Sequence, residues 1–169
     1  MNIKEINNMS EEIFINNFKN IFEESPSIAI FVEKNRPYST KEHLINSFID
    51  HFESLSLNNK KKIIKKHPDL GKKLKIQNNL TDMSKNEQKN AGLDICTADE
   101  FLFFNKMNNE FKLKFDIPFI FAVKGSNKIK IIQEFKRRLI NNDIGNEIEE
   151  SIKQVKKIAL FRLDELVYE

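Results

Sequence analysis

The chain has 169 residues, 40% of them hydrophobic, with 28 basic and 25 acidic side chains and a net charge of +3. This length can bury a core without disulfides or metals, and a single cysteine excludes an internal disulfide and a cysteine-based zinc cluster. Four of the basic residues are arginines, so the chain lacks the arginine-rich, one-sided charge of nucleic-acid-binding proteins.

No apolar run reaches the roughly 20 residues that a membrane span requires, and the first residues, "MNIKEINNMS", lack the apolar stretch of a signal peptide. The last residues, "LVYE", are not a peroxisomal signal of the Ser-Lys-Leu type. We therefore expect a soluble, intracellular protein of the cytoplasm.

Helical spacing of apolar residues dominates the chain, because only four Gly and four Pro interrupt it. The pattern predicts an all-α fold, a single compact multi-helix domain over residues 1–169. The first helix should begin after Ser10, whose hydroxyl can cap it, and end near "ESPS". After "NRPYST" a long helix should follow, with Ser39 and Glu42 at capping-box spacing and an inward face of Leu44, Ile45, Phe48, Ile49, Phe52 and Leu55.

The second half of the chain continues this pattern. A helix over "NNKKKIIKK" should end before Pro68, since proline disfavours helical geometry in the preceding residue. Further helices are predicted over "LTDMSKNEQKNAGLD" and "TADEFLFFNKMNNEFKLKF", then a buried extended segment over "DIPFIFAVKG". Two last helices should span about 127–141 and about 144–167.

His67 is the best chemical candidate in the sequence. It follows the predicted lysine-rich helix and precedes Pro68, which stiffens the backbone, and Gly71, which permits a tight turn. The flanking lysines favour a neutral imidazole, which suits general acid–base work. The alternative is a helix cap or a surface histidine, which is the commoner role at such a position.

Glu87 has two interpretations. Ser84 and Glu87 stand at capping-box spacing, so both can serve only to begin a helix. A helix N-terminus is also a good anion site, so Glu87 can equally belong to a substrate site. His43 and His51 lack the four-residue spacing of a helical metal pair, so we expect no metal site there.

Several motifs occur together in order: "HPDLG" (67–71), "LTDMSKNEQKNAGLD" (80–94), "NNEFKLKFDIPFIFAVKG" (108–125), "RRLINNDIGNEI" (137–148) and "RLDEL" (162–166). In combination they closely resemble the 2-oxo-4-hydroxy-4-carboxy-5-ureidoimidazoline (OHCU) decarboxylase family. That family carries out the last step from urate to (S)-allantoin. The resemblance implies an all-α, cofactor-free carboxy-lyase that usually forms a homodimer, with no nucleic-acid or membrane partner.

The resemblance also implies roles for particular residues. The histidine of the first motif, here His67, is the catalytic acid, and we expect Glu87 to help manage the proton. Residues matching the family's substrate contacts are Pro68, Ser84, Lys85, Asn86, Gln88, Phe119, Ile120, Phe121, Ala122, Val123 and Arg162. Main-chain amides near 84–88 and 119–123 should hold the polar edge of the substrate ring.

Two positions depart from the family pattern. Phe111 stands where the family commonly has Tyr, and Asp116 where it has Gly. These departures leave open an enzyme that acts on a related ureido or imidazolone acid. A helical interaction module without catalysis is the other alternative, against which the intact His67, Glu87, Gln88 and Arg162 argue.

Overall fold

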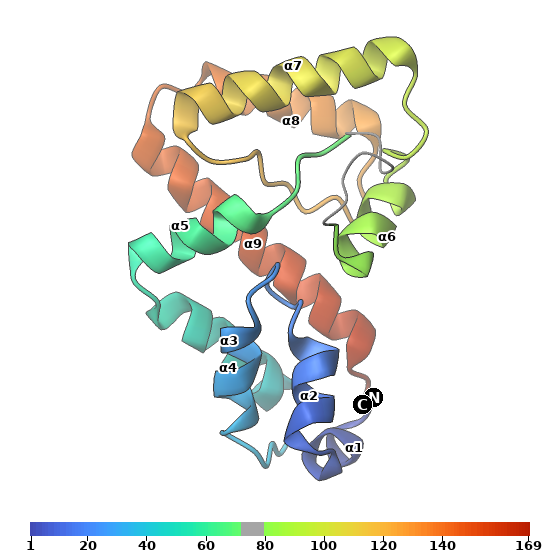
Figure 1. The fold of residues 1–169 in the computed structure, drawn as a ribbon, viewed down its shortest axis with the longest axis vertical. Coiled ribbons are helices and arrows are strands. Elements are labelled where there is room, and N and C mark those ends of the chain that lie inside the picture. The colour runs from blue at the N-terminus through green and yellow to red at the C-terminus, as the bar shows by residue number, and fades with distance from the viewer. Residues whose placement is uncertain (72–79) are drawn as a thin grey trace. The chain divides into compact units, whose positions relative to one another are not determined.

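The computed structural model describes residues 1–71 and 80–169, and every regular element in these ranges is a helix, which confirms the all-α prediction (Figure 1). The helices are α1 (Ile3–Asn8), α2 (Glu11–Phe18), α3 (Pro26–Glu33), α4 (Lys41–Ser54), α5 (Leu57–Lys66), α6 (Asp82–Asn90), α7 (Ala98–Phe115), α8 (Lys128–Ile140) and α9 (Ile144–Leu166). In these same ranges, no helix combines the length and the apolar character that crossing a bilayer requires.

The residues form two compact units, Met1–Ile63 with Lys156–Glu169, and Ile64–Val155. We call them unit 1 and unit 2. The prediction of one domain over residues 1–169 is not tested by this division and stays a prediction.

Unit 1 contains α1 to α4, most of α5 and the last part of α9. Its core is built from phenylalanine, as the composition indicates: the rings of Phe22 and Phe52 stack with centroids 4.6 Å apart, and Phe18 contacts Phe48. The two ends of the chain meet in this unit (Figure 1), because the Met1 ammonium donates to the carbonyl of Leu166 at 2.7 Å.

Helices α2 and α4 begin after hydroxyl residues, although not always the one expected, and α1, which Asn2 caps, precedes the helix expected to be the first. Ser10 caps α2 by accepting from the N–H of Ile13, which confirms that prediction, but α2 ends at Phe18, well before "ESPS". Thr40 caps α4 by accepting from the N–H of His43, so the capping box expected at Ser39 is wrong. Neighbouring hydroxyls compete for one cap, and the sequence pattern alone does not rank them.

Unit 2 contains α6, α7, α8 and the first part of α9. Helices α7 and α8 lie side by side (Figure 1), and their apolar faces meet over a phenylalanine cluster. The rings of Phe119 and Phe135 stack with centroids 3.6 Å apart, and Phe111 packs edge-on to both. Phe119 ties the segment that follows α7 into this cluster.

That segment, residues 116–125, carries no helix or strand, and most of it is buried, as predicted. Asp116 ends α7 in the left-handed conformation, with φ 56°, and its N–H donates to the carbonyl of Lys112. This geometry favours glycine, the residue that the family resemblance implies here, and aspartate is among the few other residues that adopt it. Its carboxylate pairs with Lys65 at 2.6 Å.

Candidate active site

His67 lies at the end of α5, where the sequence places it. The helix ends at Lys66, and the N–H of His67 still bonds to the carbonyl of Ile64 at 3.1 Å, closing the last turn. Only 7% of His67 is exposed, so the alternative of a surface histidine is wrong. His67 belongs to unit 2 and is followed by the half-buried Pro68.

The loop after His67 is anchored to α6 by one side chain. The Gln88 oxygen Oε1 accepts from the N–H of Gly71 at 3.2 Å, and its nitrogen Nε2 donates to the carbonyl of Asp69 at 3.4 Å. Gln88 itself is 2% exposed. The amide therefore satisfies two backbone groups that burial would otherwise leave without partners.

Helix α7 anchors the same loop from a second direction. The Asn108 nitrogen Nδ2 donates to the carbonyl of Leu70 at 2.8 Å, and Lys112 pairs with the carboxylate of Asp69 at 2.7 Å. Gly71 has φ +70°, and a Cβ atom at this position would lie 2.4 Å from Cγ of Phe104. Only glycine fits here, so the loop is fixed by packing as well as by hydrogen bonds.

Helix α6 presents one face inward, made of Ser84, Glu87 and Gln88. These residues follow the three- and four-residue spacing of a helix face; Ser84 and Gln88 are buried and Glu87 is half-buried. Lys85 and Asn86 point to solvent instead. Ser84, Glu87 and Gln88 thus share the face that Gln88 ties to the His67 loop.

The capping-box interpretation of Ser84 and Glu87 is wrong. The N-cap of α6 is Thr81, whose hydroxyl accepts from the N–H of Ser84 at 3.3 Å, and the N–H of Lys85 bonds to the carbonyl of Thr81. Helix α6 starts one turn earlier than a cap at Ser84 requires. The amides of Ser84 and Lys85 are consequently used within the helix, and substrate contacts by these two residues must come from side chains.

The segment 119–123 is held by helices α8 and α9. Nη1 of Arg138 donates to the carbonyl of Ile120 at 2.5 Å, and the N–H of Ala122 donates to Oε1 of Gln154 at 2.9 Å. Phe119, Ile120, Ala122 and Val123 are buried, and Phe121 is half-buried. Two of the main-chain groups in the predicted contact segment therefore already have protein partners.

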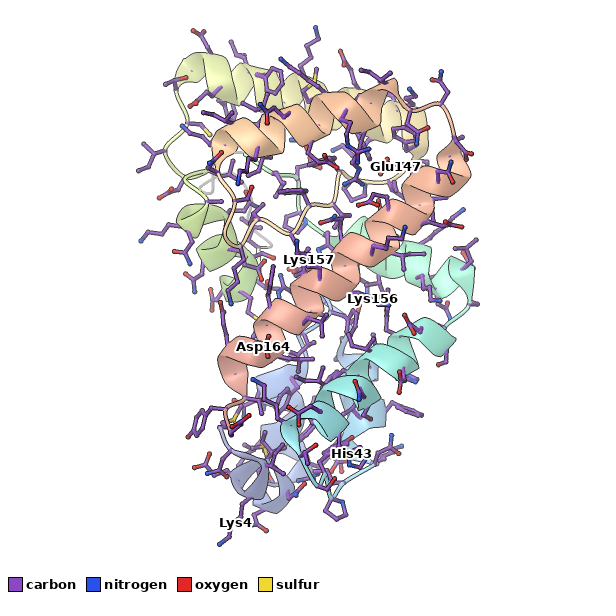
Figure 2. The ribbon with its side chains drawn as sticks, turned by 180° about the vertical axis from the view of Figure 1, so that it is seen from behind. Lys4, His43, Glu147, Lys156, Lys157 and Asp164 are labelled. Carbon is purple, nitrogen blue, oxygen red and sulfur yellow. The ribbon has the colours of Figure 1, made fainter. Side chains whose placement is uncertain are left out.

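Arg138 belongs to a buried ion pair that sequence reasoning missed. Its guanidinium bonds to both carboxylate oxygens of Glu147 and to the hydroxyl of Ser151, 3.1 Å away. Arg138 and Glu147 are each 1% exposed. Figure 2 labels Glu147 in the first turns of α9, where it faces α8. The ring centroids of Phe111 and Phe119 lie 5.6 Å and 4.6 Å from the guanidinium carbon, so both rings make cation–π contact with Arg138.

Arg162, the last predicted site residue, belongs to unit 1. Its guanidinium pairs with the carboxylate of Glu23 at 2.9 Å and donates to the carbonyl of Asn20 at 2.7 Å. Both partners of the ion pair are buried. The geometry within unit 1 thus fixes Arg162, while the remaining predicted residues lie in unit 2.

The other histidines sit in separate surroundings. The ring of His51 stacks on Phe31 with centroids 3.7 Å apart, and its partial burial lowers its pKa. His43 lies beside the hydroxyl of Ser39. Among residues 1–71 and 80–169, no three His, Cys, Asp or Glu side chains are close enough together to hold a metal ion.

Comparison with known proteins places this arrangement in context. Residues 7–164 match the OHCU decarboxylase family. The chain is 37% identical over 166 residues to a 2-oxo-4-hydroxy-4-carboxy-5-ureidoimidazoline decarboxylase of Xenopus laevis, covering 98% of this chain and 94% of that protein. It is 40% identical over its whole length to the uric acid degradation bifunctional protein of Bacillus sp. (strain TB-90), of which it spans 33%.

A solved structure has the same fold. The crystal structure of OHCU decarboxylase in the presence of (S)-allantoin superposes with a TM-score of 0.72 at 20% identity, covering 94% of this chain and 98% of that one. At this identity the likeness concerns the fold alone.

Proposed function

Because the chain belongs to the OHCU decarboxylase family, we propose that it decarboxylates 2-oxo-4-hydroxy-4-carboxy-5-ureidoimidazoline to (S)-allantoin. This is a carbon–carbon lyase reaction of urate degradation. The observation that carries the proposal is the tie between Gln88 and the loop of residues 69–71, which joins the buried His67 to the face of α6 that holds Ser84 and Glu87.

The chemistry needs no electron sink from the protein. When the bond to the carboxylate breaks and CO₂ leaves, the electron pair passes to the adjacent ring C=N of the substrate. The ureido-bearing ring carbon then takes up one proton, and the hydroxyl-bearing carbon becomes a carbonyl as its hydroxyl proton passes to the ring nitrogen that received the electron pair. The net reaction consumes one proton and releases one CO₂. The protein has to orient the ring, stabilise developing charge and deliver a proton from one face, which yields a single enantiomer.

We assign the proton chemistry to His67 and Glu87. The loop after His67 is anchored by Gln88, Asn108 and Gly71, and an imidazole held in one position suits a general acid. Thr81, and not Ser84, caps α6, so Glu87 does not complete a capping box, and we assign its carboxylate to orienting the histidine or the substrate. Both assignments rest on the family resemblance together with this geometry.

The remaining proposed substrate contacts divide according to the geometry. Ser84 and Gln88 lie on the inward face of α6, and Pro68 borders the histidine. Lys85 and Asn86 are exposed, so they would reach a substrate only at its outer edge. Segment 119–123 would contribute main-chain contacts, and Arg162 would bind the substrate as in the family motif. No cofactor is part of the proposal.

We extend the proposal to assembly and location. The family resemblance supports a homodimer, and we propose in addition that each subunit is one domain and that the enzyme acts in the cytoplasm. Light scattering coupled to size-exclusion chromatography measures the dimer, for which a mass near twice 19.9 kDa is expected. A single cooperative unfolding transition is expected of a one-domain subunit.

One assay tests the function. Freshly generated OHCU is supplied to the enzyme, and the chirality of the allantoin is followed by circular dichroism. We expect rapid formation of (S)-allantoin. Formation of racemic allantoin at the uncatalysed rate would contradict the proposal and favour a helical interaction module; rapid turnover of a related ureido acid, with none of OHCU, would identify a different substrate.

A further inference from the structure

We propose that Gln154 is a positioning residue, which fixes the peptide of Ala122 and with it the main-chain contact segment 119–123. The inference rests on the proposed function and refines it in one respect. The N–H of Ala122 donates to Gln154, so it is not one of the main-chain donors that hold the substrate.

The orientation of the Gln154 amide follows from its two partners. Oε1 accepts from the N–H of Ala122 at 2.9 Å, and Nε2 donates to the Glu150 carboxylate at 2.9 Å. The reversed amide would set two donors against each other at Ala122 and two acceptors at Glu150. Glu150 therefore selects the orientation in which Gln154 presents its oxygen to the segment.

Arg138 holds the same segment two residues earlier. It donates to the carbonyl of Ile120 at 2.5 Å, and Glu147 fixes the guanidinium. Arg138 thus holds the backbone carbonyl of Ile120, and Gln154 holds the backbone N–H of Ala122. With both ends fixed, the peptide groups of 120–122 cannot rotate independently, and the groups left for the substrate keep a constant direction.

This positioning matters because decarboxylation depends on a fixed orientation of the ring. Misplacing a reacting group by about 1 Å, even through a change remote from the chemistry, costs on the order of 10²-fold in rate. Gln154 is only half-buried, so its replacement should not prevent folding. A loss of rate without a loss of fold would distinguish positioning from general stabilisation.

The test uses three variants of the full chain. Gln154→Met keeps the size of the side chain and removes the acceptor. The double variant Glu150→Gln with Gln154→Glu exchanges the partners, so that a carboxylate accepts from Ala122 and a glutamine supports it. Lys153→Gln is the control, an exposed neighbour on the same helix.

For Gln154→Met we expect kcat/KM for OHCU to fall about 10-fold or more, while Tm falls by no more than about 4 °C. The Ala122 amide should exchange its hydrogen at least about 10-fold faster, as NMR can measure. The double variant Glu150→Gln with Gln154→Glu should regain most of the wild-type kcat/KM, and Lys153→Gln should match the wild type.

Two outcomes would overturn the inference alone: wild-type kcat/KM in Gln154→Met, or an equal loss in the exchanged pair. Absence of OHCU turnover in the wild-type protein would overturn the proposed function and the inference with it. Hydrogen exchange at Ala122 distinguishes these cases, because it reports the bond to Gln154 whether or not the protein is active.

Discussion

The backbone N–H of Gly71 donates to the side-chain oxygen of Gln88, 3.2 Å away, and this bond joins the His67 loop to helix α6. The two residues are 17 positions apart in the chain. Because both are buried, breaking the bond would leave a donor and an acceptor without partners. The catalytic assignment of His67 depends on this loop keeping one conformation.

Replacing His67 tests its assignment as the general acid. His67→Asn should retain the fold and lose stereospecific decarboxylation by on the order of 10²-fold or more, the usual cost of removing a general acid. The measurement is the initial rate of (S)-allantoin formation by circular dichroism. His43→Asn is the control, because His43 is exposed and should not matter. Near-normal turnover of His67→Asn would remove His67 from the mechanism.

Glu87→Gln tests the charge of Glu87 without changing its shape. Since Thr81 caps α6, loss of this charge should alter the free energy of unfolding by at most about 1 kcal/mol. We expect kcat/KM to fall steeply while the melting temperature stays almost the same. The control is Asp82→Asn, which removes an exposed charge from the first turn of the same helix. Wild-type kinetics in Glu87→Gln would mean that the carboxylate has no part in the reaction.

Two glycines with similar backbone geometry provide a matched pair. In Gly71→Ala the new methyl group would lie 2.4 Å from the Phe104 ring, at φ +70°. Overpacking of about 1–3 kcal/mol adds to a backbone strain of about 1–2 kcal/mol. Gly92→Ala, at φ +74° with nothing within 4 Å, carries only the strain. Urea unfolding should show the larger loss for Gly71→Ala; equal losses would mean that Phe104 moves aside freely.

Removing one partner of the buried ion pair between Arg138 and Glu147 should strongly destabilise the protein. Arg138→Met leaves the Glu147 carboxylate buried without its partner, and we expect a loss of about 3–5 kcal/mol in the free energy of unfolding. Adding Glu147→Met should recover part of this loss, since no charge then remains buried. Denaturant unfolding of the single and double variants gives the coupling energy, and strictly additive losses would show that the two residues are independent.

Chelation tests the expectation of a cofactor-free reaction. No metal-binding group of three side chains occurs in residues 1–71 and 80–169, and the substrate carries its own electron sink. We expect the rate of (S)-allantoin formation to survive exhaustive treatment with EDTA. Loss of activity that a divalent ion then restores would require a metal in the mechanism.

Much of the helix pattern could be predicted because its signals are local. Proline after His67 ends α5, Ser10 caps α2, and the run from Ile117 to Val123 is too irregular for a helix. Asn108 also left a signal, since it interrupts the apolar series of Phe104, Phe111 and Phe115 on one face of α7. A polar residue at such a core position indicates a specific partner.

Sequence by itself therefore determined the all-α pattern, the end of α5 before Pro68, the phenylalanine core, and the place of His67 at a joint between helices. Only the tertiary structure decided that Thr81 and not Ser84 begins α6, since both residue types are good N-caps, and in the folded chain Thr81 accepts from the N–H of Ser84 while Ser84 is buried. It also decided the three long-range hydrogen bonds that anchor the site. Asn108 bonds to Leu70, 38 positions away in the chain. Arg138 bonds to Ile120 across 18 positions, and Gln154 to Ala122 across 32. Hydrogen bonds across such separations form between surfaces that meet only after the helices pack, so no local spacing encodes them.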